Sequence, residues 1–126
     1  MAGFARNERI RRRADFQLVY KRGTRVHGKL FTLFLLPATD RSSPTRLGIA
    51  ATRKLGAATS RNRAKRLIRE VFRRNKISPG FDVIVVPKRE LLDASRTAIE
   101  AEYQDAVQRS IRRARGARRP DLAQGL

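Results

Sequence analysis

One basic, amphipathic segment constrains the fold of this 126-residue chain more than any other part of it: residues 61–76, with the sequence RNRAKRLIREVFRRNK. Its apolar side chains recur at i, i+3, i+4, i+7 and i+8, a spacing that places them on one stripe of an α-helix. These side chains are Ala64, Leu67, Ile68, Val71 and Phe72. The stripe predicts a helix that packs against a core, most simply one side of a sheet.

The rest of this expected helix carries dense positive charge. Arg61, Lys65, Arg69 and Arg73 are spaced four residues apart, so each neighbouring pair would destabilise the helix by about 0.2–0.5 kcal/mol. Glu70 is the one acid in the segment. A helix face that is merely solvated usually alternates the sign of its charges, whereas this face does not. We therefore interpret it as a surface that a polyanion completes.

The whole chain supports the same interpretation. It has 30 Lys and Arg against 11 Asp and Glu, a formal net charge of +19, and this charge is spread over the expected elements as well as the ends. Nucleic acid is the partner that such charge favours, because cations that neutralise phosphates release counterions. We expect no membrane partner, because no apolar run approaches the ~20 residues needed to cross a bilayer. The absence of cysteine excludes disulfides and thiolate metal sites and fits a cytoplasmic protein.

The sequence pattern predicts a single domain with alternating helices and strands. The expected elements, in order, are a helix ending before Gly23, strands at 24–27, 30–36 and 46–52, the basic helix, a strand at 81–86 and a long C-terminal helix. The strands at 30–36 and 81–86 are apolar on both faces, so both faces should be covered. The strand–helix–strand unit over 47–86 permits a parallel pairing.

Details at the ends of these elements are also expected. Thr59 or Ser60 should cap the basic helix, and Asp93 or Ser95 should open the last one. The turn-rich segment 40–44 is of the kind that links antiparallel neighbours. The small residues of the third strand, Gly48, Ala50 and Ala51, suggest a close backbone approach there. Residues 1–114 form the expected RNA-binding domain, with 1–12 as a flexible basic arm and 115–126 as a disordered tail.

No protein-borne catalytic constellation is visible in the sequence. His27 is the sole histidine, so a mechanism with a paired histidine acid and base is excluded, and we interpret it as a structural or surface residue. The one local cluster of acids consists of Glu100, Glu102 and Asp105. We interpret it as a solvated helix face, although its spacing also permits a weak metal contact. If the chain takes part in catalysis, the reacting groups must come largely from a partner, and an RNA could supply them.

The segment LGIAATRKLGAATSRNRAKRLIREVFRRNK, residues 47–76, resembles the signature region of the bacterial ribonuclease P protein subunit. In that family a strand ending in basic residues and glycine leads into a helix that begins Arg-Asn-Arg. The residues here that match this pattern are Arg53, Lys54, Gly56, Arg61, Asn62, Arg63, Lys65, Arg66 and Arg69. The flanking segments RRRADFQLVYKRG and DVIVVPK extend the resemblance over nearly all of residues 13–114.

The resemblance implies an α+β fold of the order αβββαβα, with a small mixed sheet and a left-handed crossover between its parallel strands. That hand opposes the rule that holds in ~98% of such units. The resemblance also implies a ribonucleoprotein endonuclease that removes the 5′ leader of precursor tRNA. Its RNA subunit would hold the catalytic Mg²⁺ ions. The protein would then carry no catalytic residue, no cofactor motif and no small-molecule substrate.

Two RNA surfaces follow from the resemblance. The residues expected to bind the RNA subunit are Arg53, Lys54, Arg61, Asn62, Arg63, Lys65, Arg66 and Arg69. Asn62 would either be held by local hydrogen bonds or touch RNA. Phe16, Tyr20 and Phe34 would line a cleft for the single-stranded leader, where flat rings can stack on unpaired bases. Phe34 replaces an aromatic alcohol found in some relatives, so only the stacking is expected at that position.

Two other functions fit parts of the sequence. A ribosomal or general RNA-binding protein would show the same positive charge and should bind ribosomal RNA. A protein-only nuclease would cleave RNA after every RNA cofactor had been removed.

Overall fold

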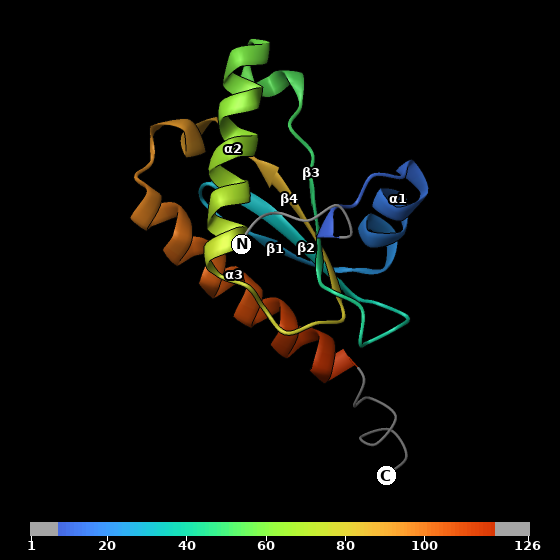
Figure 1. Ribbon diagram of the computed structural model, residues 1–126. Helices are drawn as coiled ribbons and strands as arrows, with labels where there is room; N and C mark the ends of the chain where they lie inside the picture. Colours follow the sequence, from blue (N-terminus) through green and yellow to red (C-terminus); the bar gives the residue numbers. More distant parts are fainter. Residues whose placement is uncertain (1–7, 118–126) are drawn as a thin grey trace.

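The computed structural model describes residues 8–117, which form a four-stranded sheet with helices on both of its faces (Figure 1). The main elements are α1 (Arg13–Arg22), β1 (Thr24–His27), β2 (Phe31–Pro37), β3 (Arg46–Ile49), α2 (Ala58–Arg74), β4 (Phe81–Pro87) and α3 (Arg96–Ala117). Two short 3₁₀ turns, η2 (Arg53–Leu55) and η3 (Arg89–Asp93), precede α2 and α3. The predicted α+β class and the order αβββαβα are confirmed.

The strands lie in the order β1-β2-β4-β3. β4 pairs antiparallel with β2 and parallel with β3, so the predicted parallel strand–helix–strand unit is confirmed. The left hand of its crossover stays a prediction of the resemblance. The expectation that segment 40–44 joins neighbouring strands is wrong, because β4 lies between β2 and β3. A turn signal reports a reversal of the chain but carries no information on a strand that arrives later in the sequence.

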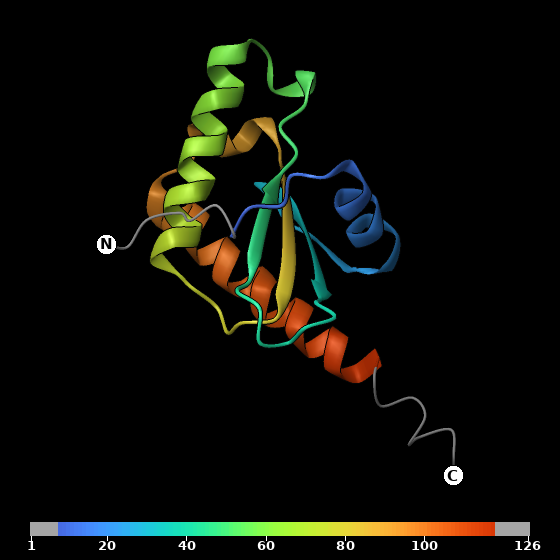
Figure 2. The ribbon, with the colours of Figure 1, turned by 45° about the vertical axis from the view of Figure 1, so that its right-hand side comes forward.

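The sheet separates two apolar clusters of unequal size. The larger cluster fills the space between the sheet and the helices α2 and α3, and it includes Leu33, Ile68 and Val107. The smaller one, with Val19 and Ile84 at its centre, lies under α1. Figure 2 shows α1 and α2 on opposite sides of the strands. The molecule is therefore a three-layer arrangement in which α1 forms one outer layer by itself.

The two-sided apolar strands explain this arrangement. In β2, Leu33 and Leu35 face the larger cluster while Phe34 faces the smaller one. In β4, Val83 and Ile84 divide in the same way. Because successive side chains of a strand point to opposite faces, a strand that is apolar at every position needs cover on both. The prediction that both strands are covered is confirmed.

The ends of α2 and β3 differ from the sequence expectation. α2 begins at Ala58, after Ala57 and without a side-chain cap, so neither Thr59 nor Ser60 is the cap residue. The helix ends at Arg74, where the backbone N–H of Asn75 donates to two carbonyls of the last turn. β3 ends at Ile49 rather than Thr52, because the chain leaves the sheet to form η2. Terminal residues of this kind depend on tertiary contacts more than on local preference.

The start of α3 follows the sequence closely. The Oγ of Ser95 accepts a hydrogen bond of 3.1 Å from the N–H of Ala98, as an N-cap residue does. The predicted apolar stripe is buried at Ile99, Tyr103 and Val107. α3 continues to Ala117, so residues 115–117 of the expected tail are helical, and residues 118–126 lie outside the described part.

Part of the N-terminal segment is packed against the fold. Arg9 forms a parallel bridge with Leu47 of β3, and the N–H of Ile10 donates to the carbonyl of Leu47 at 2.9 Å. Ile10 is 5% exposed, and Glu8 pairs with Lys76. The flexible arm expected for residues 1–12 is therefore anchored over residues 8–10, while residues 1–7 lie outside the described part. Among helices of the described chain, none has the length and apolar character that a membrane span requires.

Candidate nucleic-acid interface

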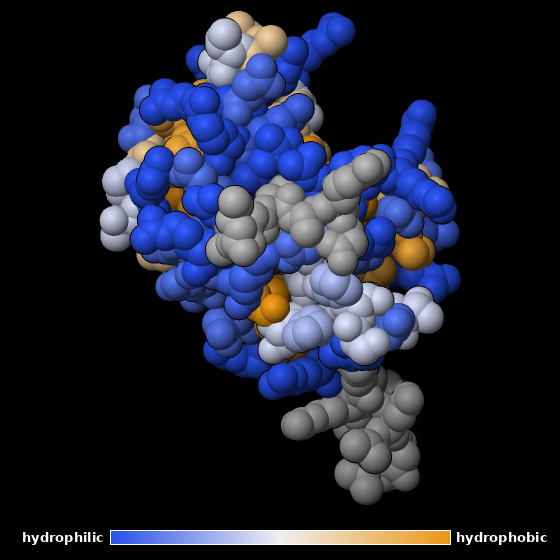
Figure 3. All heavy atoms as spheres, in the orientation of Figure 1, coloured by the Kyte–Doolittle hydropathy of each residue, from blue (hydrophilic) through white to orange (hydrophobic). Residues whose placement is uncertain are grey.

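The basic face of α2 points away from the core because the apolar stripe of the same helix is buried. Ala64, Ile68 and Phe72 are each at most 2% exposed. Since they fix the rotation of the helix, Arg63 and Arg66 are carried on its outer side and are exposed. In Figure 3 the surface over the middle of α2 is mostly hydrophilic, whereas lighter side chains lie at the upper end of the helix. The structure thus presents the predicted positive surface to solvent.

The one acid of α2 does little to neutralise this surface. Glu70 forms an ion pair of 2.8 Å with Arg96 at the start of α3, so its charge is compensated by another helix. Lys65, Arg69 and Arg73 have no ion pair with any other residue between 8 and 117. The like-charge repulsion along α2 therefore persists in the folded protein, and an anion placed against this face would relieve it.

A concave region lies along the same face. It has a volume of about 420 Å³. Its lining side chains, all from α2, are Asn62, Lys65, Arg66, Arg69, Glu70 and Arg73. Asn62 is exposed and makes no side-chain hydrogen bond with another described residue, so the local hydrogen bonding considered for it does not occur there. Its amide remains available to an outside partner.

The loop that leads into α2 holds the remaining basic residues. Thr52 accepts a hydrogen bond from the N–H of Lys54, which fixes η2 and leaves Arg53 and Lys54 exposed. Gly56 follows with φ +103°, a conformation that favours glycine, and the chain turns there into the helix. Arg61 donates to the carbonyl of Gly56 at 3.0 Å. Arg61 therefore braces the loop as well as contributing charge.

The three predicted aromatic residues form one continuous surface. Tyr20 of α1 lies between Phe16 of the same helix and Phe34 of β2, with ring centroids 6.3 Å and 4.9 Å apart. Tyr20 is 40% exposed, whereas both phenylalanines are half-buried. Burial raises the pKa of Tyr20 above its ordinary value, so its phenol stays neutral and can donate a hydrogen bond. This surface offers an exposed ring backed by two others.

Arg25 belongs to this surface although the sequence analysis did not select it. It is the register partner of Phe34 in the antiparallel pair of β1 and β2. Side chains directly opposite one another leave the sheet on the same face, so the exposed Arg25 lies beside the aromatic surface. Only the register reveals this neighbour, because Arg25 and Phe34 are nine positions apart in a chain rich in arginine.

Gly48 explains how α1 approaches the sheet. A Cβ atom at this position would lie 2.8 Å from the ring of Phe16, closer than such atoms come in proteins. The expected close approach at the third strand is therefore that of an aromatic ring from α1. Any larger residue at position 48 would push Phe16, and with it the helix, away from β3.

The aromatic and basic surfaces meet in one hollow of about 220 Å³. Phe16 lines it from α1, and Lys65 and Arg69 line it from α2. Arg9 and Arg11 of the N-terminal segment complete its charged wall. Partial burial, and after it the like charge of Arg9, lower the pKa of Arg69 from its ordinary value. The hollow thus gathers cations around an aromatic edge, an arrangement suited to a phosphate next to an unpaired base.

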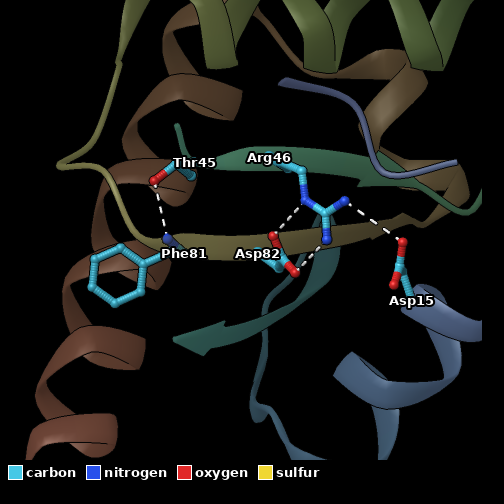
Figure 4. A network of polar contacts seen from close by, with 5 residues as sticks. All are labelled: Asp15, Thr45, Arg46, Phe81 and Asp82. Atoms are coloured by element: carbon cyan, nitrogen blue, oxygen red, sulfur yellow. Dashed lines mark hydrogen bonds and ion pairs between the residues drawn. The ribbon is translucent and has the colours of Figure 1, made fainter. Parts of the chain in front are cut away.

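Arg46 of β3 ties α1 to the sheet (Figure 4). Its guanidinium donates two hydrogen bonds, of 2.9 and 2.8 Å, to the carboxylate of Asp82 on β4, and it lies 3.5 Å from Asp15 in the first turn of α1. Hydrogen bonding to Asp82 raises the pKa of Arg46. We call these three residues the Arg46 clasp. The sequence analysis missed it because its members are far apart in the chain.

Glu100 and Glu102 of α3 have structural partners rather than the solvated positions expected for them, whereas Asp105 is exposed as expected. Glu102 accepts backbone hydrogen bonds from Lys29, Leu30 and Phe31, at 3.2, 2.8 and 3.2 Å, and so closes the turn between β1 and β2. Glu100 accepts from the side chain of Asn75. No group of three or more potential metal ligands occurs among residues 8–117.

His27 lies two positions after Arg25 in β1, so both side chains leave the sheet on the same face. It is exposed in β1, with its Nδ1 3.3 Å from the hydroxyl of Thr32. This contact fits the structural role predicted for the sole histidine of the chain.

Comparisons with known proteins agree on one family. The family model described as Ribonuclease P matches residues 4–111. The ribonuclease P protein component of Thermotoga maritima is 47% identical over 91 residues, which cover 70% of this chain and 75% of that protein. The same component of Clostridioides difficile is 33% identical over 110 residues, which cover 85% and 95% of the two chains.

Solved structures show the same relationship. The RNase P protein from Thermotoga maritima superposes with a TM-score of 0.71 at 35% identity, covering 81% of this chain and 96% of that one. The RNase P protein from Staphylococcus aureus superposes with a TM-score of 0.65 at 30% identity, covering 84% and 91%. Together with the basic helix, its entry loop and the adjoining aromatic surface, these matches show that the chain belongs to the ribonuclease P protein family.

Proposed function

We propose that this chain, as a subunit of a ribonuclease, binds the RNA subunit of ribonuclease P through α2 and the 5′ leader of precursor tRNA through its aromatic surface. The observation that carries the proposal is the hollow where Phe16 meets Lys65 and Arg69. An RNA strand that leaves the aromatic surface there would run directly onto the cations of α2. The two RNA molecules would therefore meet on one protein, in the cytoplasm where we expect it to act.

The assignment of α2 to the RNA subunit rests on charge and shape. The helix offers a row of exposed cations without stacking rings, so it suits phosphates held in a folded RNA. Arg63 and Arg66 are exposed and make no ion pair with another described residue. Such groups strengthen binding mainly by releasing counterions, which makes the affinity strongly dependent on salt.

The assignment of the aromatic surface to the leader rests on the exposed ring of Tyr20. Unpaired bases stack on aromatic side chains, and each such contact contributes about 1–3 kcal/mol. The neighbouring Arg25 can neutralise a phosphate of the same strand. A base-paired stem keeps its bases stacked inside the helix, so this surface favours a single strand.

Catalysis is assigned to the RNA subunit. The described residues bring together no group of three or more potential metal ligands, and the chain has a single histidine. In this proposal the RNA subunit would hold Mg²⁺ ions, which would supply the metal-ion chemistry of hydrolysis. The protein positions the leader and neutralises phosphate repulsion between the two RNAs.

Reconstitution tests the proposal directly. The chain is mixed with a ribonuclease P RNA subunit and a 5′-labelled precursor tRNA at low Mg²⁺, where the RNA by itself is slow. We expect cleavage at the mature 5′ end that depends on both components. Cleavage by the chain after all RNA cofactor has been removed would instead identify a protein-only nuclease. Binding to ribosomal RNA without any stimulation of cleavage would favour the ribosomal alternative.

Tyr20→Ala tests the leader assignment, and Leu18→Ala is its control. Both side chains lie on α1 and are similarly exposed, at 40% and 43%, but only Tyr20 belongs to the aromatic surface. We expect Tyr20→Ala to weaken binding of precursor tRNA by at least about fivefold, since one stacking contact contributes about 1 kcal/mol or more. Mature tRNA should bind both variants equally well. Equal losses for the precursor and mature forms would contradict the assignment.

A further inference from the structure

The last turns of α3 carry a second concentration of positive charge, which neither RNA surface includes. It consists of Arg112, Arg113 and Arg115 of α3 and Arg41 of the loop between β2 and β3, all exposed. We call it the α3 arginine patch. We propose that this patch binds the phosphate backbone of double-helical RNA. The inference rests on the proposed function only in taking RNA as the partner.

Two of the four arginines are held in place by the fold. The guanidinium of Arg41 lies over the ring of Phe81, 5.1 Å from its centroid. Arg41 and Arg115 line the same small recess beside Phe81, so the loop and the helix contribute to one surface. Arg113 donates to the backbone carbonyl of Arg25 at 2.8 Å. Side chains that are already held lose less conformational entropy when they bind a phosphate.

The charge of the patch is not compensated within the described chain. None of its arginines forms an ion pair with another residue between 8 and 117. The nearby acids are already engaged, because Asp105 pairs with Arg109, Glu102 accepts three backbone N–H groups, and Asp40 accepts from Ser42. Cations close to a helix C-terminus do stabilise its dipole. That effect accounts for the residues of α3 but not for Arg41.

The composition of the patch identifies the form of RNA. All four residues are arginine, whose planar guanidinium fits phosphate in a bidentate manner better than lysine does. The exposed large apolar side chains of the described chain are Leu18 and Tyr20, both on α1, so the patch lacks a ring for unpaired bases. A duplex presents phosphates and keeps its bases stacked inside. The patch therefore suits a helical segment.

Most of the patch lies on the opposite face of the sheet from the leader surface, and Arg113 contacts the backbone of Arg25 at the edge strand β1. α3 and α1 pack on opposite faces of the sheet, as their membership in the two apolar clusters shows. In Figure 1, α3 ends far from the N-terminal end of α2. One chain could therefore hold the leader on one side and a helical stem on the other. The stem could belong to the RNA subunit or to the precursor tRNA, since both would offer the same backbone.

Salt-dependent binding to an RNA duplex of about 16 base pairs tests the patch, with fluorescence anisotropy as the readout. Arg112→Ala/Arg115→Ala removes two cations, and Lys29→Ala/Arg89→Ala removes two exposed cations outside the patch, which also make no ion pair with another described residue, as the matched control. If both patch residues contact phosphates, the log–log salt slope should become less steep by about 1.8. Between 50 and 200 mM salt, wild-type affinity should then fall about 12-fold more than that of the patch variant. An unchanged slope, or the same change in the control, would overturn the proposal.

Directed cleavage identifies the source of the duplex in the assembled enzyme. The chain has no cysteine, so Gln108→Cys, one turn before Arg112, places a single tether for an iron–EDTA probe beside the intact patch. Thr97→Cys at the start of α3 is the control. Cuts in a helical RNA segment that occur with Gln108→Cys but not with Thr97→Cys support the proposal. The molecule that is cut, either the RNA subunit or the tRNA, is then the source of the stem. If the reconstituted enzyme is active but those cuts are absent, the patch proposal fails. If the wild type neither binds RNA nor promotes cleavage, the proposed function itself fails.

Discussion

The Arg46 clasp makes two substitutions differ sharply in their effects on stability. Asp15→Asn removes one contact of 3.5 Å between side chains that are each about 30% exposed, so we expect a cost of about 0.5 kcal/mol. Arg46→Ala leaves Asp82, whose side chain is 11% exposed, without the two hydrogen bonds it accepts from the guanidinium. That loss should cost about 2–3 kcal/mol.

Thermal unfolding and RNA binding measure the two consequences of the clasp. At about 4 °C per kcal/mol for a chain of this size, Asp15→Asn should lower Tm by about 2 °C and Arg46→Ala by about 10 °C. Asp15 directly precedes Phe16, so loosening the first turn of α1 should weaken leader binding about twofold. Affinity for the RNA subunit, which we assign to α2, should stay at the wild-type value in Asp15→Asn.

Two results would refute this reasoning. If Asp15→Asn lowers Tm as much as Arg46→Ala, the contact with Asp82 is not the dominant part of the clasp. If Asp15→Asn weakens binding of the RNA subunit and the leader alike, then α1 is not positioned independently of α2. Mature tRNA, which lacks the leader, serves as the control ligand in the binding measurements.

Three further substitutions test other parts of the structure. Glu102→Ala should lower the free energy of unfolding by about 2 kcal/mol in denaturant titrations, because three backbone N–H groups lose their acceptor, whereas Asp105→Ala on the same helix should change it by less than about 0.5 kcal/mol. Equal losses of unfolding free energy in the two variants would show that the three backbone hydrogen bonds of Glu102 add no more stability than the exposed ion pair of Asp105. Tyr103→Phe should stabilise the protein by about 1 kcal/mol at neutral pH, since its buried hydroxyl has no hydrogen-bond partner in the described chain. Burial also raises the pKa of Tyr103, so the folded state retains a proton that the unfolded chain loses above about pH 10. Stability should therefore fall as the pH rises past that value, and less steeply in Tyr103→Phe; parallel pH profiles would contradict this. Arg66→Ala should reduce the salt slope of RNA-subunit binding by about 0.7–0.9, and an unchanged slope would remove Arg66 from the interface.

The layers of the fold could be predicted because the apolar pattern is strong. The stripe of α2 and the two-sided strands β2 and β4 each specify how many faces need cover. The order of the strands could not be obtained in this way, since periodicity describes each element singly. The place of β4 between β2 and β3 is a property of long-range pairing, and the family resemblance implied the order of the elements and a mixed sheet but not this place.

The residues of the functional surfaces also differ in whether local spacing or long-range pairing reveals them. The cations of α2 and the aromatic pair Phe16 and Tyr20 follow local helical spacing, so they could be selected from the sequence. Arg25 and the Arg46 clasp could not, because each depends on the register between strands. Glu102 was misread for a related reason: its partners are backbone N–H groups about 70 residues away, and no side-chain pattern marks them.

The central position of β4 also sets the order in which the chain can fold as it is synthesised. β2 and β3 precede β4 in sequence but are not neighbours in the folded sheet. The sheet therefore lacks its connecting strand until residue 87 has been synthesised. α2 is made before the strand whose apolar face it covers, and its own like charges disfavour it in isolation. Folding therefore waits for the last strand, and a nascent chain that already exposes the cations of α2 could meet RNA before its core has closed.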